Sequence, residues 1–224
     1  MRCGNGSRRS TPIGPPTRIE RKISLRIFEL RKCFVVSNRQ EVVELLHALA
    51  GVMAERRLRW YLFGAQAAIL WGTVRVSTDA DITVEIEPAS VHAFIDAMKR
   101  HGFDLLVSDS EFLERSRVFP FRHRATGMPL DVVLAGTGME AEFLQRAIPV
   151  DVKGKDIPVI SPEDLVITKV LAGRPKDEED IRSVIALRKA SLDAGRIRSV
   201  LRMLEEALGQ SDLLPLFERE WQRN

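Results

Sequence analysis

Two aspartates, Asp79 and Asp81, stand at the entrance of an apolar segment and constrain this chain more than any other feature. Side chains two residues apart on a strand point the same way, so the two carboxylates are expected to project together. Carboxylates held this close repel each other unless a cation lies between them. Oxygen ligands suit Mg²⁺, which keeps few protein ligands and usually binds substrate phosphates as well. The pair therefore predicts a Mg²⁺ site.

The residues that precede this pair predict a place for a phosphate. Apolar residues 59–63 predict a strand, and residues 66–71 predict a short helix. The small residues Gly64 and Ala65 form the turn between them. Backbone N–H groups at a turn into a helix N-terminus bind anions. We therefore expect the backbone of Gly64 and Ala65 to approach the phosphates of a substrate.

Asp131 is the candidate for a third carboxylate of the site. It stands alone in the apolar segment 129–134, which predicts a strand. A buried, unpaired carboxylate is costly, so Asp131 requires a metal ion or a cationic partner. The alternative to a metal site is a strand-edge aspartate that pairs with Arg122 or Arg124.

The string that joins these features resembles the first signature of the nucleotidyltransferase fold superfamily, the polymerase β-like group. The matching residues are Gly64-Ala65-Gln66-Ala67, Gly72, Arg75, Thr78, Asp79 and Asp81. The string is most similar to AbiEii-like and related minimal nucleotidyltransferases of bacterial toxin–antitoxin loci. The resemblance implies that Asp79 and Asp81 hold the metals. It also implies that Asp131 bridges a second metal or acts as the base toward an acceptor hydroxyl.

Ala65 departs from the pattern of that superfamily. Many active members have Gly-Ser at this turn, and the serine hydroxyl binds phosphate. Ala65 has no hydroxyl group, which motivates an alternative in which the fold binds nucleotide without turnover. Arg75 has two open roles, pairing with phosphate or bracing the loop that carries Asp79.

A second string, from Ser161 to Ile181, is similar to the later motifs of AbiEii-like nucleotidyltransferases. There the lysine and the first aspartate complete the nucleotide pocket, which implies these roles for Lys169 and Asp177. Lys169 shares a helix face with apolar residues, so it is expected to point inward and to require an anion. That anion is either the triphosphate or Asp177. Asp180 is expected to be structural.

The periodicity of the remaining sequence predicts an α/β (α+β) fold, a mixed β-sheet flanked by helices with a small helical C-terminal part. Further strands are expected at 82–86, 103–107, 148–152 and 157–160, and a hairpin joins 112–124 to 129–134. Further helices are expected at 37–56, 88–101, 139–146, 165–172, 175–189, 194–208 and 212–221. The predicted domains are a nucleotidyltransferase domain at 36–190 and C-terminal helices packed on it at 191–224.

Charge is unevenly distributed along the chain. Residues 1–35 contain nine Arg or Lys and two Glu, a net +7, so the rest carries −4 of the total +3. Gly, Ser, Pro and Arg without periodicity predict a disordered basic tail at 1–35, although such a tail could also hold nucleic acid. Arginines that alternate with phenylalanines within 112–124 could bind RNA, or form one half-buried strand with a charged side.

The remaining composition is consistent with a cytoplasmic protein. Cys3 and Cys33 give neither a disulfide framework nor a metal-ligand spacing. The four histidines form no ligand-spaced pair, and no apolar run approaches the length needed to span a bilayer.

We therefore expect a Mg²⁺-dependent enzyme that moves a nucleoside monophosphate from an NTP to a hydroxyl group. The resemblance implies a macromolecular acceptor, the tRNA 3′ end or a protein, and a cognate toxin or antitoxin partner. The alternatives are a non-catalytic, antitoxin-like or nucleotide-binding protein on the same fold, and a small-molecule nucleotidyltransferase of the aminoglycoside-modifying type.

Overall fold

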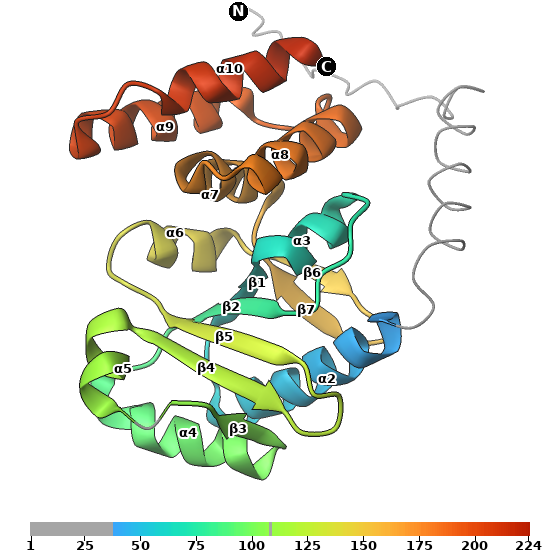
Figure 1. Ribbon diagram of the computed structural model, residues 1–224, viewed down its shortest axis with the longest axis vertical. Helices are drawn as coiled ribbons and strands as arrows, with labels where there is room; N and C mark the ends of the chain where they lie inside the picture. The colour runs from blue at the N-terminus through green and yellow to red at the C-terminus, as the bar shows by residue number, and fades with distance from the viewer. Residues whose placement is uncertain (1–37, 108) are drawn as a thin grey trace, which may run out of the picture. The chain divides into compact units, whose positions relative to one another are not determined.

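A mixed β-sheet of seven strands forms the centre of the described part of the chain, residues 38–107 and 109–224 of this computed structural model (Figure 1). Its strand order is β3-β4-β5-β2-β1-β7-β6. The strands are β1 (Trp60–Phe63), β2 (Ala80–Val84), β3 (Phe103–Leu105), β4 (Val118–His123), β5 (Pro129–Leu134), β6 (Ile148–Asp151) and β7 (Asp156–Val159). The predicted basic tail, 1–35, lies outside the described residues.

Helices flank this sheet, which confirms the predicted α/β fold class. They are α2 (Asn38–Arg56), α3 (Gly64–Trp71), the short 3₁₀-helix η1 (Pro88–Ser90), α4 (Val91–Arg100), α5 (Ser110–Ser116), α6 (Met139–Arg146), α7 (Pro162–Ala172), α8 (Pro175–Arg188), α9 (Ala194–Leu208) and α10 (Leu213–Arg223). No described helix is long and apolar enough to cross a membrane.

The core lies where α2 and α4 cover the sheet (Figure 1). Leu45, Leu46 and Leu49 of α2 are fully buried, as their helical spacing predicts. On β2 and β5 the buried Ile82 and Leu130 alternate with aspartates, the period expected for a strand with one apolar face. The aspartates therefore lie on the opposite face from this part of the core.

The helices α7 to α10 pack together on the side of the sheet away from α2 and α4 (orange to red in Figure 1). Ser161 caps α7 by accepting a hydrogen bond from the backbone N–H of Asp164, and Gly173 ends α7 in the left-handed region. The predicted domain boundary at residue 190 falls between α8 and α9.

One prediction about the local structure was wrong. Residues 112–124 were expected to form one continuous strand, but the first part belongs to α5 and only Val118–His123 form β4. Arg117 adopts a positive φ of 55° between the two elements, a conformation that interrupts regular structure. Phe119 and Phe121 are buried in the core, so they cannot stack on RNA bases, and the half-buried strand of the alternative is limited to β4.

A buried ion-pair network joins three helices. Asp164 of α7 is 0% exposed, and its carboxylate accepts hydrogen bonds from Ser161 Oγ, from Arg146 Nε (3.0 Å) and from Arg196 Nη2 (2.8 Å). Arg146 belongs to α6 and Arg196 to α9. Both arginines would lose their buried counter-charge if Asp164 were neutral.

We expect Asp164→Asn to lower the free energy of unfolding by about 2 kcal/mol, because Arg146 and Arg196 lose charge-assisted hydrogen bonds to a buried carboxylate, while Arg196 keeps its ion pair with Glu142. Urea denaturation followed by far-UV circular dichroism measures this change. The matched control is Asp96→Asn, an exposed aspartate of α4, which should change stability by less than about 0.5 kcal/mol. Equal urea midpoints for Asp164→Asn and the wild type would show that this network does not hold the helices.

Candidate active site

The parallel pairing of β2 with β5 brings two of the three predicted carboxylates together. Asp81 and Asp131 are direct partners in the register of this pair, so their backbones lie about 4.8 Å apart, the ordinary spacing of neighbouring strands. Asp79 directly precedes β2. Asp79 and Asp131 are exposed, and Asp81 is partly buried. Three acidic residues from two non-consecutive strands therefore gather at one place in the sheet.

Burial and neighbouring carboxylates raise the pKa values of Asp81 and Asp131. Burial, followed by the charges of Asp79 and Asp131, raises the pKa of Asp81 to about 6, and the charges of Lys169 and Lys176 oppose this shift. Burial and the charge of Asp79 likewise raise the pKa of Asp131. Such a cluster gains a proton or a cation in preference to three negative charges.

Three carboxylates fit a hard divalent cation in donor chemistry. Their side chains do not already form a metal site, since no group of three or more His, Cys, Asp or Glu in 38–107 and 109–224 is arranged to hold an ion. Ser77 Oγ donates a 2.5 Å hydrogen bond to Asp79 Oδ1, which occupies one of the Asp79 oxygens. A bound cation would have to compete with this contact.

Asp131 has no ion pair with the two arginines considered for it. Arg124 pairs instead with Asp104, at 3.2 Å, and no ion pair joins Arg122 to Asp131 within the described part of the chain. The predicted alternative, in which Asp131 pairs with Arg122 or Arg124, is therefore wrong.

The turn at Gly64 lies directly against Asp81. Gly64 has a φ of 66°, and a Cβ atom added there would lie 2.0 Å from Asp81 Oδ2. Only glycine adopts this conformation readily and leaves room for the carboxylate. Gly64 also begins α3, and no side chain caps the N-terminus of this helix. Its backbone donors and the Asp81 carboxylate are therefore neighbours.

Lys169 points inward and is 8% exposed, as expected from its helix face. Its Nζ contacts Asp177 Oδ1 at 2.7 Å and Asp180 Oδ2 at 2.8 Å. Of the two anions considered for Lys169, the structure therefore supplies Asp177, and it adds Asp180 as a second. Asp177 and Asp180 are both buried.

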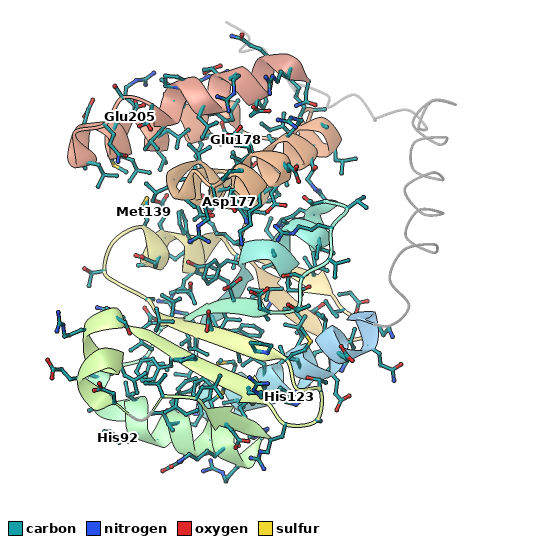
Figure 2. All side chains as sticks on the ribbon, viewed as in Figure 1. His92, His123, Met139, Asp177, Glu178 and Glu205 are labelled. Atoms are coloured by element: carbon teal, nitrogen blue, oxygen red, sulfur yellow. The ribbon has the colours of Figure 1, made fainter. Side chains whose placement is uncertain are left out.

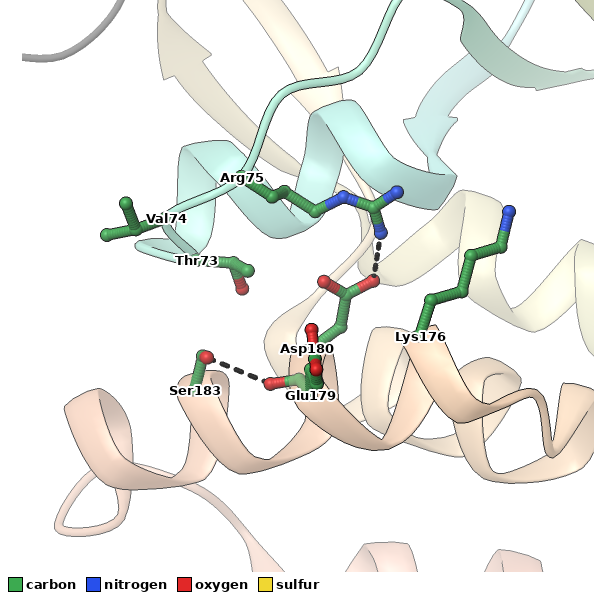
Figure 3. A pocket seen from close by; sticks show the side chains of 7 residues that line it. All are labelled: Thr73, Val74, Arg75, Lys176, Glu179, Asp180 and Ser183. Atoms are coloured by element: carbon green, nitrogen blue, oxygen red, sulfur yellow. Dashed lines mark hydrogen bonds and ion pairs between the residues drawn. The ribbon is translucent and has the colours of Figure 1, made fainter.

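Arg75 has a carboxylate partner, Asp180, that the sequence did not name. Its Nη1 contacts Asp180 Oδ2 at 2.8 Å, so Asp180 joins the loop after α3 to α8 (Figure 3). The same Asp180 oxygen also contacts Lys169. This structural role of Asp180 agrees with its prediction. The ion pair lies beside a cavity of about 190 Å³ lined by Thr73, Val74, Arg75, Lys176, Glu179, Asp180 and Ser183.

The histidines lie away from these residues. Figure 2 shows His92 and His123 in the half of the molecule that contains β3 and β4, far from Asp177. His47 contacts the backbone carbonyl of Val152, and His101 contacts Glu55. They contribute nothing to the carboxylate cluster.

Gln66 belongs to the string that resembles the superfamily signature, but sequence reasoning gave it no role in the site. It is a buried polar side chain in α3, and its amide contacts the loop that carries Asp79. The available signal was a single amide in the otherwise apolar helix Ala65–Trp71.

Comparison with known proteins places the sequence in a family of nucleotidyltransferases. A family model described as "nucleotidyltransferase of unknown function (DUF6036)" matches residues 40–207, a range that contains every predicted site residue. A comparison with curated proteins found no match.

Two solved structures share the fold. The solution structure of the antibiotic-resistance factor ANT(2″)-Ia is 19% identical, with a TM-score of 0.53, and the match covers 75% of this chain and 94% of that one. The crystal structure of an antigenic nucleotidyltransferase-like protein from Paracoccidioides brasiliensis is 15% identical, with a TM-score of 0.52, and covers 80% and 93%. At these identities the likeness concerns the fold alone.

We expect Gly64→Ala to destabilise the protein and to displace Asp81. The positive φ alone costs about 1–2 kcal/mol for a residue with a Cβ, and the contact with Asp81 Oδ2 adds to it. Gly209→Ala is the matched control, because Gly209 has the same φ of 66° and nothing lies within 4 Å of its added Cβ. Thermal unfolding of both variants measures the difference. Equal losses would show that Asp81 does not lie against Gly64.

The raised pKa of Asp81 predicts a pH dependence of stability. The folded state binds the Asp81 proton more tightly than the unfolded chain does. The free energy of unfolding that this proton contributes is therefore present at low pH and is lost as pH rises through about 6. We expect wild type to lose on the order of 2 kcal/mol relative to Asp81→Asn between about pH 4 and about pH 7. Urea denaturation in the presence of a chelator measures both proteins. The same dependence of the free energy of unfolding on pH in wild type and Asp81→Asn would contradict the raised pKa of Asp81.

Proposed function

Because the chain belongs to the DUF6036 family of nucleotidyltransferases, we propose that it transfers a nucleoside monophosphate from an NTP to an acceptor hydroxyl at the Asp79–Asp81–Asp131 cluster. Family membership confirms the predicted nucleotidyltransferase superfamily and the predicted transferase activity. The observation that carries the proposal is the register pairing of Asp81 with Asp131, beside Asp79 and against the turn at Gly64.

Asp79, Asp81 and Asp131 would hold Mg²⁺. The bound cation would neutralise triphosphate charge and lower the pKa of the attacking hydroxyl. In the reaction the hydroxyl oxygen forms a bond to the α-phosphorus, the bond from that phosphorus to the bridging oxygen breaks, and pyrophosphate leaves. The alternative role of Asp131, which the resemblance also implies, is to receive the hydroxyl proton in place of binding the metal, and its exposed position suits this role.

The backbone N–H groups at Gly64 and Ala65 would bind the β- and γ-phosphates without help from a side-chain hydroxyl. Lys169 and Asp177 would complete the pocket as a buried pair beneath the nucleotide. Lys176 is exposed at the start of α8, has no ion pair within the described residues, and is close enough to lower the pKa of Asp81. We assign Lys176 to the triphosphate on this basis, because the nearby Lys169 and Arg75 are already paired.

The acceptor in this proposal is a macromolecule, the tRNA 3′ end or a protein, and the place of action is the cytoplasm. The resemblance of the two signatures to AbiEii-like nucleotidyltransferases supports this acceptor class and a toxin–antitoxin role. A small-molecule acceptor is the alternative that the experiment below distinguishes.

The test is label transfer from each α-³²P NTP in the presence of Mg²⁺. Purified full-length protein is incubated with total tRNA, with cell lysate, or with a panel of aminoglycosides. We expect Asp79→Ala/Asp81→Ala to reduce transfer by at least about 1,000-fold, because the metal supplies several kcal/mol of transition-state stabilisation. Asp96→Asn, which removes an exposed carboxylate of α4, should transfer label as wild type does.

γ-³²P NTP provides the second control, since nucleotidyl transfer releases this label as pyrophosphate and phosphoryl transfer would attach it to the acceptor. Equal transfer by wild type and the double variant would overturn the assignment of these aspartates. Mg²⁺-dependent nucleotide binding without any transfer would favour the non-catalytic alternative that Ala65 motivates.

A further inference from the structure

The segment between α3 and β2, residues 72–79, contains no regular secondary structure, yet it ends at one of the proposed metal ligands. Val74, Val76, Thr78 and Asp79 are exposed along it. A segment without a helix or strand ladder requires other contacts to hold a carboxylate within the tolerance that metal chemistry demands. We define residues 72–79 as the carboxylate loop.

Gln66 supplies such contacts from inside the molecule. Its side chain is 5% exposed, and Nε2 donates to the backbone carbonyl of Ser77 at 3.2 Å and to that of Asp79 at 3.0 Å. A primary amide is suited to this task, because its single nitrogen carries two N–H donors. The two accepting carbonyls flank Thr78, so one side chain fixes the backbone on both sides of that residue.

Gln66 and Ser77 contact different parts of Asp79. Ser77 Oγ binds the carboxylate of Asp79 itself, whereas Gln66 binds backbone carbonyls, including that of Asp79. The Asp79 carbonyl belongs to the peptide that leads into Ala80, the first residue of β2. Gln66 therefore holds the loop at the point where it enters the strand that carries Asp81.

Gln66 also lies two residues after Gly64, the residue that packs against Asp81. The same short helix thus lies next to both aspartates. The Asp81 carboxylate packs against Gly64, where no Cβ atom is in the way, and the Gln66 amide binds the backbone of Asp79. A shift of the loop relative to α3 would change the separation of the two carboxylates.

We propose that Gln66 is a positioning residue that sets Asp79 relative to Asp81 for divalent-cation binding. It acts through the loop backbone and touches neither the cation nor the nucleotide. This inference rests on the proposed function, because it assigns a metal-binding role to the aspartates.

The test compares Gln66→Met, which keeps the length of the side chain and removes both donors, with Gln145→Met on the exposed surface of α6. The first readout involves no turnover. Mn²⁺ binding to the protein with an α,β-methylene NTP analogue is measured by electron paramagnetic resonance. We expect Gln66→Met to weaken Mn²⁺ binding at least about tenfold, and Gln145→Met to bind as wild type does.

The second readout is catalysis. We expect kcat of Gln66→Met to fall by about 100-fold, the scale of a misplacement near 1 Å, with a higher half-saturating Mg²⁺ concentration and little change in KM for the NTP. Gln66→Asn retains the amide on a shorter side chain and should lie between wild type and Gln66→Met in both readouts. This variant also provides the test if Gln66→Met does not fold, as judged by circular dichroism.

Wild-type Mn²⁺ affinity and kcat in a folded Gln66→Met protein would overturn the inference, as would wild-type values in Gln66→Asn if that is the only folded variant. The failure of the proposed function has a different signature. In that case wild type and Asp79→Ala/Asp81→Ala would bind Mn²⁺ equally and neither would transfer label, whereas failure of the Gln66 inference alone leaves this wild-type difference intact.

Discussion

Electrostatic repulsion among Asp79, Asp81 and Asp131 is the constraint on which the site depends. Ordinary strand pairing brings Asp81 and Asp131 together, because the in-register parallel ladder of β2 and β5 gives their backbones no alternative spacing. Burial first, and then the charges of Asp79 and Asp131, raise the pKa of Asp81. A fold that retains such a cluster requires compensation from nearby positive charge. Lys169 and Lys176 supply part of it, and a divalent cation would supply the rest.

Lys169, one of the compensating positive charges, belongs to α7 and has its partners on α8. Lys169 is held between Asp177 and Asp180, and Asp180 also binds Arg75. Two cations and two anions therefore alternate in a buried cluster that is neutral overall. Because removing any one member would leave a charge uncompensated, the cluster fixes α7, α8 and the carboxylate loop as a set. Its position also explains why Lys176, outside this cluster, is the better candidate for binding substrate phosphate.

Much of this architecture could be predicted from local sequence patterns. The apolar segment 129–134 predicted β5, the turn residues before it predicted the hairpin at Gly127, and helical spacing of apolar residues predicted α9. The continuous strand expected at 112–124 failed because the positive φ of Arg117 separates a helical turn from β4. The partner of Arg75 could not be chosen from sequence, since Asp180 lies 105 positions later and the contact depends on how α8 packs. For Lys169 the sequence named Asp177 as one of two possible anions, and the packing of α7 on α8 decides between them. The role of Gln66 left a different kind of gap. Its acceptors are backbone carbonyls, which leave no trace in residue type.

The short helix α3 contacts the aspartates, the carboxylate loop and α8. Its first residue must be glycine because Asp81 occupies the space of a Cβ, its N-terminus offers backbone donors, and its buried amide holds the loop before β2. Its last residue, Trp71, donates a hydrogen bond to the Ile160 carbonyl and lies beneath the guanidinium of Arg188 in α8. α3 is thus fixed at one end by the sheet and by α8, and at the other by the aspartate it accommodates. The contacts of Gly64, Gln66 and Trp71 therefore hold α3 in place without a hydroxyl group at position 65.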